Sequence, residues 1–247
     1  MQRFFLHLAY CGKPYCGWQE QPNGRSVQAC VQDALQILLR EPIKVVGAGR
    51  TDTGVHASSF YAHFDTQKNY SYEQRRAWLY KLNSILDKEI VIYHIFEVED
   101  FLHARFSAIE RSYQYFIHTH KNPFLEDYSY FIRMPFKANL IQEAGLLLCG
   151  SHDFTSFSKL HTQTKTNVCN LKQANFNYMG EERWFFTFTA DRFLRNMVRS
   201  MVGTLLQIGM GKISCEDLID VLEAKDRGRA GMSVPAKALF LTDIKYF

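Results

Sequence analysis

The chain has 247 residues, of which 47% are hydrophobic and 22% are charged. This composition is typical of a globular protein of one or two domains, and it excludes a disordered chain, a collagen and a simple coiled coil. The 29 basic and 25 acidic side chains give a formal net charge of +4, which permits a nucleic-acid partner without requiring one. No apolar stretch reaches the roughly 18 residues of a membrane span, and residues 1–10 lack the pattern of a signal peptide.

The cysteines indicate a reducing compartment and no metal site. None of the six forms a C-x-x-C pair, which argues against zinc-ribbon and thioredoxin-like motifs. Without an export signal we expect reduced thiols in a cytoplasmic protein. A metal site at Cys11 and Cys16 needs further ligands that the sequence does not supply, so ordinary buried thiols are the simpler interpretation.

The first half of the chain alternates strand and helix patterns. Apolar residues recur at three- and four-residue spacing after Ser26, which predicts a helix that ends before Pro42. The remaining elements that we expect here are strands over 3–10, 43–46, 58–65 and 90–98, and a helix over 72–86.

The second half has a similar outline. We expect a strand over 111–119, a helix over 138–149, a hairpin of 168–178 and 183–190 with Gly180 in the turn, helices over 192–208 and 215–224, and a last strand from Leu239. Each half therefore follows β-α-β-β-α-β, the split β-α-β or ferredoxin-like plan. The fold class is α+β with mainly antiparallel sheets, in halves 1–105 and 106–247 that flank a central cleft.

The segment that carries chemistry is residues 47–57, GAGRTDTGVHA. It follows a predicted strand, and its glycines favour a tight loop that presents the carboxylate of Asp52 beside Arg50. A dinucleotide-binding loop that begins at Gly47 needs glycine at position 52, and a P-loop needs Gly-Lys-Ser/Thr, so neither nucleotide motif fits.

Two other interpretations of this loop stay open from the residues alone. Asp52-Thr53-Gly54 is the triplet of aspartic proteases, but that chemistry needs a second carboxylate, and the sequence holds one such triplet. The loop is also compatible with a purely structural turn, in which Asp52 satisfies nearby backbone N–H groups.

Four segments in order along the chain resemble the tRNA pseudouridine synthases of the TruA family. They are GWQEQPNGRSVQ (17–28), GAGRTDTGVHA (47–57), FLHARFSAIERSYQY (101–115) and FLRNMVRSMVGTLLQIG (193–209). The second matches every fixed position of the family motif G-x-G-R-T-D-x-G-V-H-A. Near the C-terminus the family usually has Gly-Leu where this chain has Ala238-Leu239.

The resemblance implies the pseudouridine synthase fold and an isomerase. The expected reaction converts uridine to pseudouridine at positions 38, 39 and 40 of the tRNA anticodon stem-loop. It needs no cofactor and no metal, and the resemblance makes Asp52 the nucleophile. The family works as a homodimer that binds tRNA across both subunits. A non-catalytic module that binds structured RNA is the alternative function, because the ferredoxin-like plan also serves RNA recognition.

The resemblance also assigns roles to other residues. Arg199 is expected to pair with Asp52, and Tyr113 to stack on the target uracil and take part in removing the C5 proton. Leu239 would contact the base from its other side, and Arg50 would hold the flipped nucleotide. His56 is expected to bind substrate or to order the loop.

The remaining candidates are phosphate contacts chosen by charge. Arg192, Arg195 and Arg199 are three and four residues apart on one face of the predicted helix 192–208, which leaves Arg192 and Arg195 for phosphates. Arg25 is a third candidate.

Overall fold

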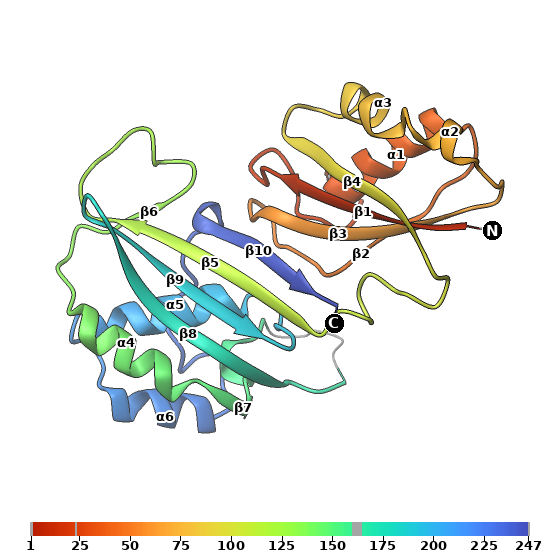
Figure 1. Ribbon diagram of the computed structural model, residues 1–247. Helices are drawn as coiled ribbons and strands as arrows, with labels where there is room; N and C mark the ends of the chain where they lie inside the picture. Colours follow the sequence, from red (N-terminus) through yellow and green to blue (C-terminus); the bar gives the residue numbers. More distant parts are fainter. Residues whose placement is uncertain (1, 23, 160–164, 247) are drawn as a thin grey trace. The chain divides into compact units, whose positions relative to one another are not determined.

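The computed structural model describes residues 2–22, 24–159 and 165–246. The chain forms two compact units: unit 1 comprises Met1–Ile109 with Leu241–Phe247, and unit 2 comprises Glu110–Phe240 (Figure 1). Within the described residues, none of the helices combines the length and apolar character that crossing a membrane requires. All six cysteines lie in the described residues and are free thiols, as expected.

Unit 1 is a sheet with helices packed on one of its faces. Its elements are β1 (Gln2–Tyr10), α1 (Val27–Leu39), β2 (Val45–Gly47), β3 (His56–Thr66), α2 (Tyr72–Arg75), α3 (Trp78–Ile85), β4 (Ile90–Val98) and the end of β10 (Leu239–Lys245). β1 pairs antiparallel with β3 and with β4, and β2 pairs antiparallel with β3. The order β4-β1-β3-β2 is that of a ferredoxin-like sheet, so the expected plan is confirmed for unit 1.

The helices of unit 1 follow from local signals. Ser26 caps α1 by accepting a hydrogen bond from the Ala29 N–H, and Val27, Val31 and Leu35 are among the residues that α1 buries. The predicted helix 72–86 is instead two helices, α2 and α3. The interruption at residues 76–77 is followed by Trp78, whose buried ring lies 5.2 Å from that of Phe4.

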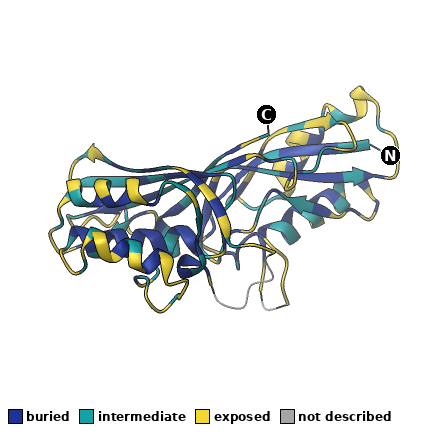
Figure 2. Cartoon of the chain, turned by 90° about the horizontal axis from the view of Figure 1, so that it is seen from below, coloured by how far each residue is buried: buried dark blue, intermediate teal, exposed yellow. Residues whose placement is uncertain are grey.

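Unit 2 has its helices on one face of its strands (Figure 1). Its elements are β5 (Glu110–His118), β6 (Tyr130–Phe131), α4 (Ala138–Leu147), β7 (Gly150–Asp153), η1 (Thr155–Phe157), β8 (Val168–Gly180), β9 (Arg183–Ala190), α5 (Met197–Gly209), α6 (Cys215–Glu223), η2 (Ala236–Ala238) and the start of β10. Its strand order is β5-β9-β8-β7, antiparallel throughout, and β6 adds a parallel pair to β5. The helices of unit 2 have buried residues on one side and exposed residues on the other (Figure 2).

Three details of unit 2 differ from the sequence predictions. The helix predicted over 192–208 begins at Met197, because Asn196 before it has a left-handed backbone with φ +68°. The hairpin turn consists of Glu181 and Glu182, both with positive φ, as a type I′ turn requires, rather than of Gly180. The last strand was expected in a second half of residues 106–247. Its residues from Leu241 on instead group with unit 1, in which β10 lies beside β3.

A buried histidine links the sheet of unit 1 to the segment that follows β4. His63 of β3 is 3% exposed, and its Nδ1 accepts a hydrogen bond of 3.1 Å from the Ala104 N–H. Burial, together with the positive charges of Arg3 and His103, lowers the pKa of His63 to about 4, against the opposing effect of Asp65. His63 is therefore neutral in the folded protein over the range in which an exposed histidine becomes charged.

This predicts a pH-dependent stability. Between pH 6.5 and 4 the unfolded chain protonates His63 and the folded chain does not, so the free energy of unfolding falls as the pH falls. The slope of the free energy of unfolding against pH approaches about 1.4 kcal/mol per pH unit, and the total loss reaches about 3 kcal/mol near pH 4. Urea denaturation of wild type and His63→Gln across this range should show a shallower slope for the variant. Exchange of the exposed His120 for Gln is the control, and equal slopes in all three proteins would contradict the assignment.

Candidate functional site

The Asp52 loop joins β2 to β3 through a tight turn. The Val55 N–H donates a hydrogen bond of 3.1 Å to the Asp52 carbonyl, and Gly54 at the third position has φ +79°. A type II turn requires a positive φ at that position, which explains the glycine. Asp52 is half-buried, whereas Arg50 and Thr53 are exposed. The loop therefore holds a half-buried carboxylate on a turn of fixed shape, with an exposed arginine two residues before it.

The residue before Asp52 is held from two sides. Thr51 is buried, and its hydroxyl is hydrogen-bonded to the hydroxyl of Tyr10 of β1 at 2.9 Å. Its carbonyl accepts a hydrogen bond of 3.3 Å from the Trp18 N–H. Earlier in the loop, the Ala48 N–H donates to the Tyr61 carbonyl at 2.8 Å. These contacts fix the backbone on the N-terminal side of the carboxylate.

The segment around Trp18 supports the loop, a role that the sequence did not reveal. The Trp18 ring packs on Phe60 of β3, with ring centroids 4.2 Å apart. The first turn of α1 holds the same segment, because the N–H groups of Val27 and Gln28 donate to the carbonyls of Gly17 and Trp18. The motif at 17–28 and the motif at 47–57 are therefore parts of one structure.

His56 lies beneath the loop. Its ring is 1% exposed, and its Nδ1 accepts a hydrogen bond of 3.2 Å from the Gly12 N–H. This position orders the start of β3 against the residues after β1, in agreement with the loop-ordering alternative. Its other expected role, binding substrate, receives no support from a ring that is buried in unit 1.

In unit 2, Arg199 and Tyr113 occupy half-buried positions on α5 and β5. The Arg199 Nε donates to the Val234 carbonyl at 2.8 Å, and the Val234 N–H donates to the Arg199 carbonyl at 3.2 Å. The Tyr113 ring meets the edge of Phe193 at 5.0 Å. Leu239 is 5% exposed at the start of β10.

The segment 231–235 is fixed against α5 by close backbone contact. A Cβ on Gly203 would lie 1.9 Å from the Met232 carbonyl oxygen, so no larger residue fits there without movement. The Gly231 N–H donates to the Thr204 hydroxyl at 2.9 Å, and the Tyr115 hydroxyl donates to the Pro235 carbonyl at 3.0 Å. The guanidinium of Arg199 thus lies beside a backbone with little freedom to move.

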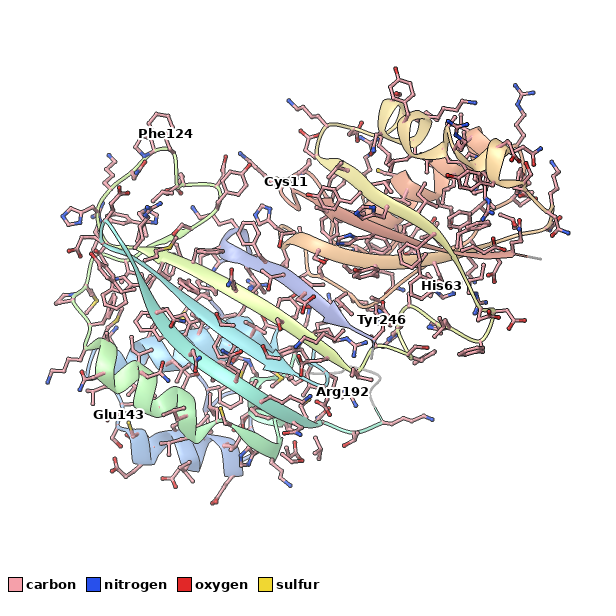
Figure 3. All side chains as sticks on the ribbon, in the orientation of Figure 1. Cys11, His63, Phe124, Glu143, Arg192 and Tyr246 are labelled. Atoms are coloured by element: carbon pink, nitrogen blue, oxygen red, sulfur yellow. The ribbon has the colours of Figure 1, made fainter. Side chains whose placement is uncertain are left out.

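The three expected phosphate contacts occupy different settings. Arg192 and Arg195 precede α5, so they do not share a helix face with Arg199 as expected. The Arg192 N–H donates to the Asp191 carboxylate, and Arg192 is labelled in Figure 3. Arg25 in unit 1 forms an ion pair of 2.8 Å with Asp87.

The candidate residues divide between the units. Arg25, Arg50, Asp52 and His56 belong to unit 1. Arg192, Arg195, Arg199, Tyr113 and Leu239 belong to unit 2. The ion pair expected between Asp52 and Arg199 joins residues of different units and stays a prediction. Among the described residues, no three or more His, Cys, Asp or Glu side chains are grouped as metal ligands.

Comparison with known proteins shows the family. A family model described as tRNA pseudouridine synthase matches residues 144–246. The chain is 48% identical over 246 residues to tRNA pseudouridine synthase A of Bacteroides fragilis, covering 100% of this chain and 97% of that protein. It is 48% identical over 248 residues to the protein of the same name of Parabacteroides distasonis, covering 100% of this chain and 96% of that protein. The chain therefore belongs to the tRNA pseudouridine synthase A (TruA) family of isomerases.

The support behind Asp52 yields a prediction. Tyr10→Phe removes the hydrogen bond to Thr51 with little change of shape, and we expect the free energy of unfolding to fall by about 1 kcal/mol. We also expect slower turnover with unchanged tRNA affinity, because the carboxylate loses its fixed position. Tyr93→Phe, at a ring that is 43% exposed, is the matched control. Wild-type stability and turnover in Tyr10→Phe would contradict the proposed support.

Proposed function

We propose that the protein isomerises uridine to pseudouridine at positions 38, 39 and 40 of the tRNA anticodon stem-loop, with Asp52 as the nucleophile and no cofactor. One observation carries the proposal: a half-buried aspartate on a turn whose backbone is held by buried hydrogen bonds. Family membership and the match of residues 47–57 to the family motif agree with this role.

The chemistry suits a lone carboxylate. The N1–C1′ bond of the uridine breaks, the uracil turns, and C5 bonds to C1′. The C5 proton is then lost and N1 gains one, so atoms and electrons balance without an oxidant or an energy source. The Asp52 carboxylate assists either by forming a covalent bond or by stabilising positive charge at C1′. Attack at C1′, attack at C6 and passage through a glycal all fit this arrangement.

The other candidates have supporting roles in the same proposal. Arg199 is the ion-pair partner that orients the Asp52 carboxylate. Tyr113 stacks on the uracil and takes part in removing the C5 proton, and Leu239 packs against the base. Arg50 is exposed beside the carboxylate, where it can hold a nucleotide that has left its stack.

The proposal extends to partners and location. tRNA is the substrate, and it is bound mainly through shape and phosphates, because the major groove of A-form RNA is too narrow for side chains to read. Arg192, Arg195 and Arg25 are the proposed phosphate contacts, with Arg25 released from Asp87 when RNA binds. The protein acts in the cytoplasm as a homodimer.

The decisive experiment removes the charge of Asp52. Asp52→Asn keeps the shape of the side chain, so we expect the isomerisation rate to fall by about 1,000-fold or more while tRNA affinity stays within a few-fold of wild type. Purified protein and unmodified tRNA transcripts with uridine at 38–40 suffice, without metal or nucleotide. Pseudouridine is mapped by chemical labelling and reverse transcription.

The matched control is Asp220→Asn, which removes an exposed carboxylate from α6 and should leave the rate unchanged. Loss of both binding and activity in Asp52→Asn would indicate a structural role for Asp52. Tight binding without pseudouridine formation by the wild-type protein would favour the non-catalytic RNA-binding module.

A second experiment tests Arg199. Arg199→Ala should lower kcat by about 100-fold with little change in tRNA affinity, because a carboxylate that has lost its partner is misplaced. Arg199→Lys should restore part of the activity, since it keeps the charge but not the planar guanidinium. Arg229→Ala, at an exposed position in the same unit, is the control. Full activity of Arg199→Ala at wild-type stability would refute the ion-pair assignment.

A further inference from the structure

The motif at 101–115 contains a turn that the proposed function does not use. Residues 103–107 are closed by two reciprocal hydrogen bonds: the Ser107 N–H donates to the His103 carbonyl, and the His103 N–H donates to the Ser107 hydroxyl, both at 2.9 Å. The His103 Nδ1 also accepts from the N–H groups of Arg105 and Phe106, at 3.1 and 3.2 Å. Four hydrogen bonds therefore fix a turn of five residues, which we call the 103–107 turn.

Hydrogen bonds from side chains of unit 1 hold this turn in place. The Ala104 N–H donates to His63, and the Ala104 carbonyl accepts a hydrogen bond of 2.7 Å from the Tyr246 hydroxyl. His63 and Tyr246 are both labelled in Figure 3. Arg3 forms an ion pair with Asp65 and donates to the Leu102 carbonyl at 2.9 Å. Side chains from β1 and β3 and one that follows β10 thus hold the backbone on both sides of Ala104.

The side chains on the outer side of the anchored turn are open to solvent. Phe106 is 77% exposed, and Arg105 is exposed with its guanidinium carbon 5.7 Å from the centre of the Phe106 ring. The His103 ring lies 4.4 Å from the Phe106 ring and supports it from within the turn. What distinguishes this exposed ring is its setting, because a guanidinium lies beside it and hydrogen bonds fix the loop that carries it.

We infer that the 103–107 turn binds a nucleotide of the RNA substrate, with Phe106 stacking on an unpaired base and Arg105 contacting a phosphate. The inference rests on the proposed function. An aromatic face beside a guanidinium is the combination by which proteins bind unstacked nucleotides. The anchoring of the turn also favours binding, because a ring held in place loses little entropy when a base stacks on it.

The charge of Arg105 favours RNA over a second copy of the chain as the occupant. A phosphate satisfies a guanidinium directly and releases bound counterions. An apolar protein interface would have to remove the guanidinium of Arg105 from water, which is costly without a buried anionic partner.

The test compares tRNA binding and turnover in substituted proteins. Phe106→Ala should weaken tRNA binding and raise KM by about 10-fold or more, the usual loss for one stacked base, with kcat within about two-fold of wild type. Phe106→Trp should keep the affinity, and its added fluorescence should be quenched by tRNA. Arg105→Ala should also reduce the slope of log Kd against log salt concentration by about 0.7 to 0.9, the value of one phosphate contact.

Arg133→Ala is a matched control, because its guanidinium carbon also lies 5.7 Å from the centre of a phenylalanine ring, that of Phe131 in unit 2. It should leave KM and the salt slope unchanged. Thermal unfolding of each variant shows that the fold is retained.

Three results would overturn the inference. The first is wild-type KM and salt slope in both Phe106→Ala and Arg105→Ala. The second is no quenching of Phe106→Trp by tRNA. The third is a shift of the monomer–dimer equilibrium in sedimentation with unchanged tRNA affinity, which would assign the turn to contact between copies. If wild-type protein binds tRNA but forms no pseudouridine, the proposed function fails, while the binding measurements still test the turn.

Discussion

The loop around Asp52 depends on Thr51, a buried residue that is held at both its side chain and its carbonyl. The hydroxyl is bonded to Tyr10 on β1, and the carbonyl accepts from Trp18 in the segment before α1. Because Thr51 directly precedes the aspartate, these two contacts determine where the turn of residues 52–55 begins. The backbone bond from Val55 to Asp52 then closes the turn. The carboxylate takes its direction from this frame.

In unit 2, backbone contacts also fix the surroundings of Arg199. There the constraint is the close approach of Gly203 to the Met232 carbonyl, which brings the segment 231–235 against α5. The Val234 carbonyl then lies where the Arg199 Nε donates to it. In both units a side chain that carries charge is placed by backbone contacts made one or a few residues away. In the proposed reaction such placement would cost little, since the groups are already arranged.

Local sequence signals were sufficient for most of the fold. Ser26 and the apolar spacing after it predicted α1, and the alternation over 90–98 matched β4. The start of α5 was missed because nothing in the apolar pattern of residues 193–209 shows that Asn196 adopts a left-handed backbone. The grouping of the residues from Leu241 on with unit 1 was missed because strands that are paired over 180 residues apart in the sequence leave no periodic signal. Ser58 and Leu241, which are linked by a hydrogen bond, lie on two such distant segments.

For the site, the sequence offers candidates for the chemistry more readily than the residues that support them. Asp52 and Arg50 stand out by type within a glycine-rich loop, whereas Arg199 is a candidate through the family resemblance, and the roles of all three stay predictions. The support of Thr51 by Tyr10 and Trp18 has no such signal, because buried hydroxyl and indole groups are common in any core. For His56 the sequence favours packing and loop ordering over proton transfer, beside a possible contact with substrate, and the ring is buried. The type of a residue shows which chemistry it can perform. The hydrogen bonds that hold it in place are visible only in the structure, because they join segments that are far apart in the sequence.

The four segments that resemble the family are therefore best understood by what their backbones do. The segment around Trp18 holds Thr51, the 103–107 turn is closed on itself and anchored by His63, and α5 receives the segment 231–235. Most of the residues in these segments cannot react with a nucleotide at all. In the proposed reaction they would position the few that can, and a reaction that relies on a single carboxylate, as proposed for Asp52, leaves no other group to correct a misplaced one. On that proposal, the rigidity of these supports is part of the chemistry rather than a property of the fold alone.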